Sequence, residues 1–201
     1  MTSHSPESEE LTELRQQLDQ AKQEANEMRQ RLEQAEQEAN HDMLTGLYSR
    51  RYFEKALRAL YAEYRQGRVP FSVITMDIDF LLNVNEAYGE KVGDFALKSV
   101  GHMIMRSMKG RGVSARYGVQ DFMVLLPETS CEDATKLTES IREEMSSTGF
   151  EMTNAGVNIS VTISCGVAQI HDDDTVDTLV DRAVQALYLA RKRGRNRVIS
   201  E

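Results

Sequence analysis

An unbroken heptad pattern near the N-terminus most restricts what this chain can fold into. Between residues 11 and 39, apolar side chains recur at alternating steps of three and four, and no glycine or proline interrupts the run. The residues of this seam are Leu11, Leu14, Leu18, Ala21, Ala25, Met28, Leu32, Ala35 and Ala39. Because this spacing keeps one apolar stripe facing a partner helix, it predicts a coiled-coil stalk over residues 11–41.

Charged residues beside the seam favour a parallel pair of helices. In a parallel, in-register dimer, each g position faces the e position five residues further along the other helix. Glu24 then faces Arg29, with opposite sign. In the same way Arg31 faces Glu36. Four of the nine seam residues are alanine, which buries little area, so we expect a weak homodimer that the following domain helps to hold. The alternative is a single solvated helix, since sequence rich in Ala, Glu, Gln and Lys is helical on its own.

Composition narrows the class of protein. A chain of 201 residues with 40% hydrophobic content holds one well-cored domain, here residues 42–201, plus an appendage. The net charge of −8 argues against a nucleic-acid partner. Residues 1–10 are polar and are expected to be a disordered tail, and no long apolar stretch predicts a membrane span or a signal peptide. Cys131 and Cys165 lack a CxxC spacing, so we expect reduced core cysteines in a cytoplasmic protein.

Residues 42–199 alternate between helical and strand-like patterns. We expect helices at 51–64, 95–108, 132–145 and 179–193, and strands at 71–76, 113–117, 122–126 and 157–168. The second and third strands flank a four-residue tip and predict a hairpin. The β-α-β-β-α-β succession predicts an α+β domain with a central antiparallel sheet and helices on one face.

Five segments of this domain carry motifs in a fixed order. They are Asp42–Arg51 (DMLTGLYSRR), Asp77–Asp94 (with Asp77-Ile-Asp, Asn85, Gly89 and Gly93-Asp94), Arg116–Phe122 (RYGVQDF), Val161–Ala168 (VTISCGVA) and Ala186–Asn196 (ALY, then GRN). Each motif is weak alone, but together and at this spacing they make the domain resemble the GGDEF domain of diguanylate cyclases. The signature of that family is Arg-Tyr-Gly-Gly-Asp/Glu-Glu-Phe, from which residues 119–121 depart.

The resemblance implies a nucleotidyl-cyclase-like fold and an enzyme that condenses two GTP molecules into cyclic di-GMP between two facing domains. Phosphoryl transfer of this kind depends on metal ions held by carboxylates, and Mg²⁺ or Mn²⁺ would accompany GTP here. The resemblance implies a metal ion at Asp77, with help from the backbone of Ile78. Taken alone, an Asp-x-Asp at a strand end also caps turns in unrelated proteins.

The same resemblance implies how the nucleotide would be held. It makes Asn85 and Asp94 the residues that read the guanine edge, and both are present. It assigns phosphate contacts to Arg195 and to Arg191, which stands where a lysine is usual, so the charge is kept with altered geometry. A basic helix end also complements the dipole of its own helix, which is the alternative interpretation of these arginines.

Several positions have lost the chemistry that the family needs. Leu82 stands in place of a phosphate-supporting lysine, and Gln120 replaces the signature acid that completes the metal site. A neutral amide is a poorer ligand for Mg²⁺ than a carboxylate. Asp121 replaces the signature glutamate with a side chain one methylene shorter, so we interpret it as a vestigial catalytic residue. Val119 replaces the second glycine, and a β-branched residue is strained where φ must be positive, so we expect a remodelled turn.

A second site of the family is also degenerate. Many members bind their product through an inhibitory Arg-x-x-Asp motif that ends six residues before the first signature glycine. Lys109 and Gly112 occupy its charged positions here, so the aspartate is absent. The resemblance therefore implies that product binding through this site is lost.

The losses favour a binding module over an enzyme. Together they should cost several orders of magnitude in rate, since one electrostatic contact is often worth about 10²–10³. Our hypothesis is a catalytically inactive signalling or scaffolding dimer that requires no cofactor, acts through an unidentified protein partner and holds a guanine nucleotide. The alternatives are a slow diguanylate cyclase that uses Asp77 and Asp121, and a purely structural dimer.

Overall fold

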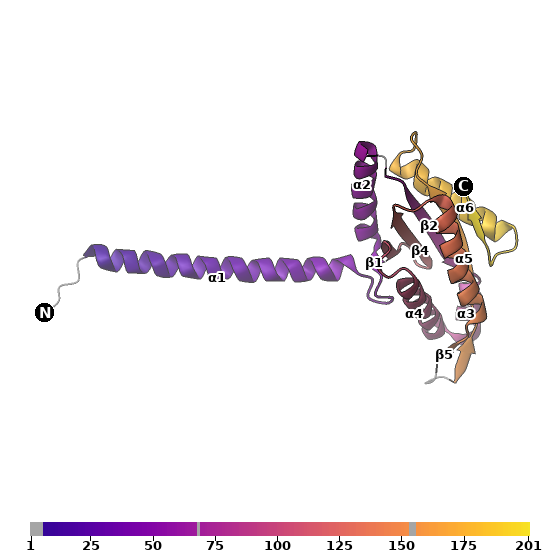
Figure 1. Ribbon diagram of the computed structural model, residues 1–201. Coiled ribbons are helices and arrows are strands. Elements are labelled where there is room, and N and C mark those ends of the chain that lie inside the picture. Colours follow the sequence, from indigo (N-terminus) through magenta and orange to yellow (C-terminus); the bar gives the residue numbers. More distant parts are fainter. Residues whose placement is uncertain (1–5, 68, 153–155) are drawn as a thin grey trace. The chain divides into compact units, whose positions relative to one another are not determined.

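The structure, a computed structural model, describes residues 6–67, 69–152 and 156–201, and it divides the chain into two units at residues 39 and 40. The first unit is a single helix, α1 (Pro6–Asn40), drawn in indigo and purple in Figure 1. Of the tail predicted over residues 1–10, residues 1–5 lie outside the described residues and residues 6–10 are already helical. None of the described helices is both long enough and apolar enough to cross a membrane.

The seam of α1 faces solvent in the single chain. Leu14, Leu18, Met28 and Leu32 are each more than half exposed. The polar surface of the helix instead carries contacts one turn apart, such as the hydrogen bond from Gln20 Nε2 to Glu24 Oε1 at 3.0 Å. Among the seam side chains that the structure describes, these four therefore form an apolar stripe that faces solvent.

The second unit contains every helix and strand that the sequence predicted. Its elements are β1 (Tyr48–Ser49), α2 (Arg50–Gly67), β2 (Phe71–Ile78), α3 (Leu81–Tyr88), α4 (Glu90–Ser107), β3 (Val113–Arg116), β4 (Asp121–Pro127), α5 (Cys131–Ser147), β5 (Phe150–Met152), β6 (Val157–Ile159), β7 (Ile163–Gln169), α6 (Val176–Lys192) and β8 (Val198–Ser200). The expected strand over residues 157–168 is divided into β6 and β7. The short elements α3, β1, β5 and β8 were not predicted.

The main sheet has the strand order β1-β3-β4-β2-β7-β8. Its four inner strands pair in antiparallel fashion, which confirms the predicted central sheet. The two edge strands pair in parallel, so the whole sheet is mixed. The parallel edge at β8 arises because α6 carries the chain back before it pairs with β7, as in a β-α-β unit. Strands β5 and β6 form a separate two-stranded ribbon.

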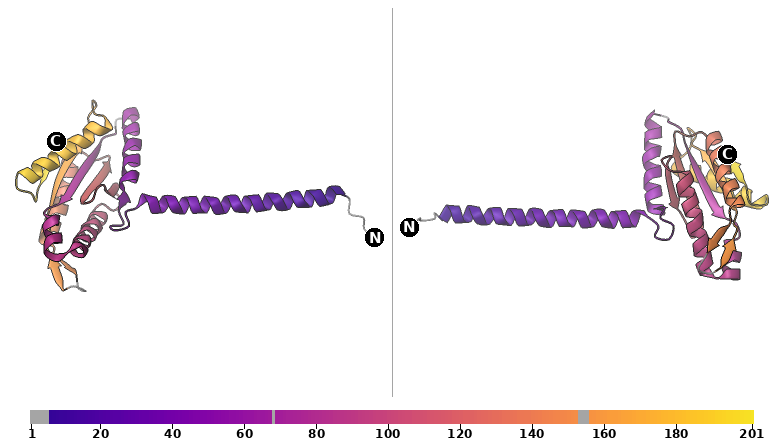
Figure 2. Two further views of the ribbon diagram at one scale, coloured as in Figure 1. Left: turned by 180° about the vertical axis from the view of Figure 1, so that it is seen from behind. Right: turned by 60° about the horizontal axis from the view of Figure 1, so that its bottom comes forward.

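Helices cover both faces of the sheet, which corrects the expectation that they lie on one face (Figure 2). On one face, Phe53 of α2 and Leu179 of α6 belong to the same core cluster as Val73. On the other, Val100 of α4 and Ile141 of α5 cluster with Ile74 and Met76, among others. All eight residues of β2 are buried, because helices pack on both faces of this strand; five of them are apolar, and Ser72, Thr75 and Asp77 are polar.

Helix α6 lies unusually close to strand β7. A Cβ atom added at Gly166 would come within 2.1 Å of the carbonyl oxygen of Ala183 and 2.4 Å of the amide nitrogen of Leu187. Only glycine permits this approach of a helix backbone to a strand. This close packing fixes the direction of the α6 axis, and therefore the position of the basic residues at the C-terminal end of the helix.

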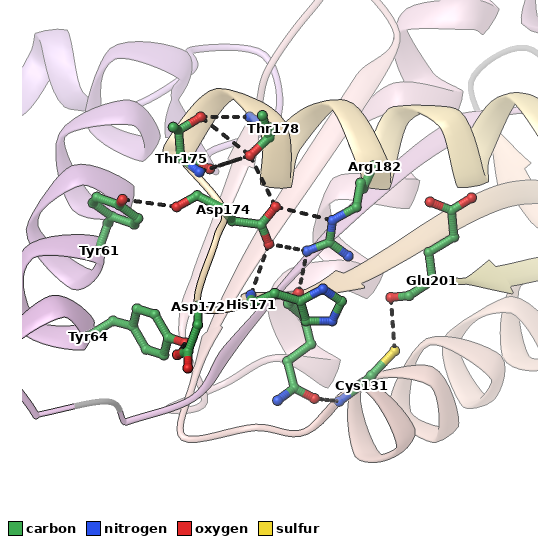
Figure 3. A network of polar contacts seen from close by, with 11 residues as sticks. Tyr61, Tyr64, Cys131, His171, Asp172, Asp174, Thr175, Thr178, Arg182 and Glu201 are labelled. Carbon is green, nitrogen blue, oxygen red and sulfur yellow. Dashed lines mark hydrogen bonds and ion pairs between the residues drawn. The ribbon is translucent and has the colours of Figure 1, made fainter.

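A buried carboxylate holds the N-terminal end of α6 (Figure 3). Asp174 accepts hydrogen bonds from the backbone N–H of His171 at 2.9 Å and from Thr178 Oγ1 at 3.0 Å, and it forms an ion pair with Arg182. Tyr61 of α2 donates to the Asp174 carbonyl oxygen at 3.0 Å. Since these partners come from α2, the β7–α6 loop and α6, Asp174 ties three segments of one layer together.

Candidate nucleotide and metal site

Two carboxylates meet where β2 ends and β4 begins. Asp77 and Asp121 are directly opposite each other in the antiparallel register of these strands. The side chain of Asp77 is 7% exposed, whereas that of Asp121 is 43% exposed. Ile78, the last residue of β2, pairs with Ile163 of β7. The structure thus brings the predicted metal residue and the vestigial catalytic residue to one end of the sheet.

Arg191 joins these two carboxylates. It lies in the last turn of α6, and its Nη2 atom forms an ion pair with Asp77 Oδ2. The same nitrogen is 3.6 Å from Asp121 Oδ1. Arg191, which the resemblance assigns to phosphate binding, therefore lies directly beside the predicted metal residue Asp77 and the predicted vestigial residue Asp121.

The acid–base character of Asp77 reflects its burial. Removal from water raises the pKa of Asp77, the charge of Arg191 opposes this shift, and the charges of Asp121 and Asp79 add to it; the net result is a pKa of about 6. The Oδ1 atom of Asp77 is buried and has no hydrogen-bond partner among the described residues. One oxygen of this carboxylate thus forms an ion pair with Arg191, and the other is removed from water without gaining a hydrogen bond from the described residues.

A structural role that the sequence analysis missed belongs to Asp79. This buried carboxylate accepts hydrogen bonds from Thr162 Oγ1 and Ser164 Oγ, each at 2.6 Å, and from the backbone N–H of Asn196 at 3.0 Å. It therefore fastens the α6–β8 loop to the end of β2. The second aspartate of the Asp-x-Asp pattern was the available signal for this role.

The loop that Asp79 holds presents Arg195 to solvent beside Phe80. The Arg195 guanidinium lies 4.4 Å from the centre of the Phe80 ring, in a cation–π contact. Both residues have left-handed backbone, with φ of 64° and 59°, so the contact is made by two tight turns. Leu82, near the start of α3, is exposed and brings no charge to this region.

The two residues that the sequence analysis expects to read guanine lie on α3 and α4, which meet at Gly89. That residue has φ of 86°, which favours glycine at the junction. Asn85 of α3 packs its side chain against Gly93 of α4, where an added Cβ would lie 1.7 Å from Asn85 Oδ1. This oxygen is buried and has no hydrogen-bond partner in the described part of the chain, whereas Asp94, the residue after Gly93, is exposed. The α3–α4 junction therefore keeps an unused acceptor beside a solvent-facing carboxylate.

The signature turn closes without the strain that the sequence led us to expect. Val119 is 83% exposed and is not among the described residues with positive φ. The amides of Tyr117 and Gly118 both donate to the carbonyl oxygen of Asp121, at 2.8 and 3.2 Å. Arg116 Nη2 donates to the Val119 carbonyl oxygen at 2.7 Å. Gln120, at the end of this turn, is half-buried and adds no charge to the carboxylate pair.

Gly112, where the resemblance places the inhibitory aspartate of the family, cannot easily hold a side chain. A Cβ added at Gly112 would come within 2.0 Å of the carbonyl oxygen of Leu125. Gly112 and Lys109 instead line a hollow of about 250 Å³ with Tyr48 and Met105. An aspartate at this position would require the backbone to move.

Comparison with known proteins now identifies the class of domain. The family model described as "Diguanylate cyclase, GGDEF domain" matches residues 39–197. The chain therefore belongs to the GGDEF domain family. It is also 34% identical to the response regulator PleD of Caulobacter vibrioides over 161 residues, and 35% identical to diguanylate cyclase A of Treponema denticola over 161 residues. These matches span 80% and 78% of this chain but only 36% and 43% of the two relatives.

Solved structures show the same architecture. The coiled coil and GGDEF domain of DgcB from Caulobacter crescentus, in complex with c-di-GMP, superposes with a TM-score of 0.88 at 28% identity and covers 94% of this chain and 99% of that one. Diguanylate cyclase SiaD of Pseudomonas aeruginosa, in complex with its activator SiaC, gives a TM-score of 0.78 at 26% identity, over 96% of this chain and 74% of that one. Both likenesses extend beyond the residues that the family model matches.

The metal ion that the family implies does not fit the carboxylates as they are arranged. Arg191 occupies one oxygen of Asp77, and the other is buried. Mg²⁺ demands near-octahedral geometry and usually keeps several waters, which a buried oxygen does not admit. In the described part of the chain, no three His, Cys, Asp or Glu side chains gather closely enough to hold a metal ion.

Proposed function

We propose that this chain is a catalytically inactive GGDEF module of cyclic di-GMP signalling, which dimerises, holds a guanine nucleotide and acts through a protein partner. One contrast carries the proposal: the guanine side of the site is kept, while the catalytic side is not. Asn85 and Asp94, the residues expected to read the guanine edge, are both present, whereas Gln120 is neutral and Leu82 has replaced the phosphate lysine.

The residues that this chain has lost are the ones whose charges contribute most to the reaction of diguanylate cyclases. Joining two GTP molecules requires positioned phosphates and cations that neutralise charge in the transition state. Each lost electrostatic contact is often worth about 10²–10³ in rate, and three are altered at Leu82, Gln120 and Asp121. No cofactor is required for the binding role, and a bound GTP would arrive as its Mg²⁺ or Mn²⁺ complex.

Recognition of guanine needs less than catalysis does. Side-chain oxygens that accept hydrogen bonds from a ligand reject an analogue without the matching donors, because the acceptors are then left unpaired. The N1–H and exocyclic amine of guanine are donors of this kind. Asn85 and the exposed carboxylate of Asp94 supply the matching acceptors.

The stalk supports a parallel homodimer. Its exposed seam is the kind of apolar stripe that a second copy covers, and DgcB, to which this chain is similar, was solved with its coiled coil. SiaD, another similar protein, was solved with an activator protein, which supports a protein partner for this module. We place the module in the cytoplasm, with neither nucleic acid nor membrane as partner.

Turnover and binding together test the proposal. The purified full chain is incubated at high concentration with GTP and Mg²⁺, then Mn²⁺, and the nucleotides are separated by chromatography. We expect no cyclic di-GMP, and we expect a fluorescent GDP analogue to bind with an affinity that Asn85→Ala or Asp94→Ala reduces. If the wild type forms cyclic di-GMP and the Asp77→Ala variant does not, the proposal that the domain is catalytically inactive is wrong.

The second candidate, a slow cyclase, has one observation in its favour. Asp121 retains a carboxylate directly opposite Asp77, so the pair that would hold a metal ion is still present. This alternative requires Asp121→Ala to abolish product, whereas the binding module tolerates that change. A purely structural dimer is the outcome if neither turnover nor nucleotide binding is detected.

A further inference from the structure

We infer that Arg191 is a resident cation in the metal position of this domain, so that guanine nucleotides bind without a protein-held divalent ion. The part of this inference that concerns nucleotide rests on the proposed function, whereas the part that concerns the metal does not. It assigns a specific role to the guanidinium at the end of α6.

Arg191 lies beside both Asp77 and Asp121. Its Nη2 atom pairs with the buried carboxylate of Asp77 and approaches the carboxylate of Asp121 to 3.6 Å. One guanidinium therefore lies within reach of both acids that face each other across β2 and β4. A single cation already occupies the position between two carboxylates that a metal ion would otherwise take.

The charges around Asp77 do not allow Arg191 and a divalent metal ion to occupy this position together. Asp77, Asp79 and Asp121 contribute three negative charges, Arg191 contributes one positive charge, and Gln120 contributes none. Adding a dication while Arg191 stays would place like charges a few ångströms apart, at a cost that low dielectric magnifies. Metal binding therefore requires Arg191 to leave both acids.

The identity of the residue matters as much as its charge. A guanidinium is planar, always protonated and presents a fork of donors that matches carboxylates, whereas an ammonium is a strongly hydrated point charge. Arginine also loses less on desolvation than lysine would at the same place. Since the resemblance puts a lysine here in the family, the exchange strengthens the internal contact at the expense of a free phosphate ligand.

The helix that carries Arg191 is held in place at its start and near its middle. Gly166 lets α6 lie against β7, and the ion pair of Asp174 with Arg182 fixes its start (Figure 3). The Nε atom of Arg191 is itself buried. The fold therefore holds the guanidinium of Arg191 in place, unlike that of an arginine whose side chain moves freely on the surface.

The decisive test is a Mn²⁺ titration of the full chain without nucleotide, followed by the EPR signal of the free ion near neutral pH. Wild type should show no Mn²⁺ site that depends on Asp77. Arg191→Met should bind one Mn²⁺ at least about tenfold more tightly, since it leaves two carboxylates without their counter-charge. Arg191→Met/Asp77→Asn should lose that site, and Arg193→Met, an exposed neighbour, should resemble wild type.

Two results would overturn the inference. One is a wild-type Mn²⁺ site that Asp77→Asn removes, and the other is a folded Arg191→Met variant that gains no site. Circular dichroism checks the folding of the variant. If Arg191→Met does not fold, wild-type affinity for a GDP analogue decides: a change within about twofold between Mg²⁺ and EDTA supports the inference, and a larger loss in EDTA contradicts it.

The two proposals fail in different ways. The Mn²⁺ titration contains no nucleotide, so it can succeed even when no guanine nucleotide binds to the chain. Conversely, nucleotide can bind through Asn85 and Asp94 even when a metal ion proves able to displace Arg191. Only turnover of GTP that requires Asp77 would contradict both at once.

Discussion

The ion pair between Arg191 and Asp77 joins the last turn of α6 to the buried end of β2. It links the C-terminal helix to the central strand at the point where the family places its metal ion. The same contact therefore bears on stability and on chemistry, and both consequences can be measured.

Breaking this pair should destabilise the domain. Arg191→Met leaves Asp77 charged and buried, and we expect a loss of about 1–2 kcal/mol in the free energy of unfolding near neutral pH, discounted because Arg191 is partly exposed. In an Asp77→Asn background the same change should cost much less. Urea unfolding of the four proteins measures the coupling, with Arg193→Met as the matched exposed control.

The loss of stability caused by Arg191→Met should also depend on pH. The pKa of Asp77 is raised to about 6, so the folded state binds a proton more readily than the unfolded state, and this group favours folding most at low pH. Its contribution falls as pH rises towards about 6, where Arg191 becomes the compensating charge. Arg191→Met should therefore cost less near pH 5 than near pH 7.5, and an equal cost at both would contradict the assignment.

A second prediction concerns the packing of Asn85 on Gly93. Because a Cβ at residue 93 would lie 1.7 Å from Asn85 Oδ1, Gly93→Ala should push the amide out of position. We expect the affinity for a fluorescent GDP analogue to fall about tenfold, as for the loss of one well-placed hydrogen bond.

The double variant makes this test specific. If Gly93→Ala acts only through Asn85, then Gly93→Ala/Asn85→Ala should bind no more weakly than Asn85→Ala alone. Gly67→Ala adds the same methyl group at the end of α2, where its nearest neighbour is 4.0 Å away, and should leave affinity unchanged. Additive losses would mean that Gly93 affects binding by another route.

Long elements and motif positions could be predicted from the sequence, because periodicity and residue type are local. Helices α2, α4, α5 and α6 follow from apolar spacing, whereas the roles that the motif gives to Asn85 and Asp94 stay predictions. The two-residue strand β1 and the short helix α3 carry too few residues for a periodic signal. They form because neighbouring elements supply their partners.

The contacts between distant segments could not be predicted. Arg191 was assigned to phosphate binding, and nothing in its local sequence shows that α6 ends beside Asp77. The hydrogen bonds that Thr162 and Ser164 donate to Asp79 likewise depend on strand register. Sequence suggested which residues matter, whereas their partners follow from how β2, β7 and α6 pack.

A third prediction tests the parallel stalk. Arg31→Glu would place two acids opposite each other at both symmetric positions of the dimer, and we expect the dissociation constant to rise about tenfold. Glu36→Arg should weaken the dimer similarly. Arg31→Glu/Glu36→Arg restores opposite signs and should recover most of the wild-type affinity. Sedimentation equilibrium at low salt measures all four, and a double variant as weak as the single ones would argue against this register.

The fourth prediction concerns Asp174. Burial alone would raise the pKa of this carboxyl, but hydrogen bonds from Arg182, the His171 amide and Thr178 outweigh burial and lower it (Figure 3). A depressed pKa means that Asp174 stabilises the fold fully above its ordinary value of 3.8. That contribution is lost as pH falls through the lowered pKa.

Asp174→Asn should therefore destabilise the domain most near neutral pH. The neutral amide leaves Arg182 partly buried without its counter-charge, and we expect a loss of about 2–3 kcal/mol in the free energy of unfolding. The gap from wild type should narrow as pH falls below about 4, because the wild-type carboxyl then loses its own charge. Asp173→Asn, an exposed neighbour, is the matched control and should change stability little at any pH. A gap that stays constant from pH 7 to pH 3 would show that Asp174 acts through its shape and hydrogen bonds, and not through its charge.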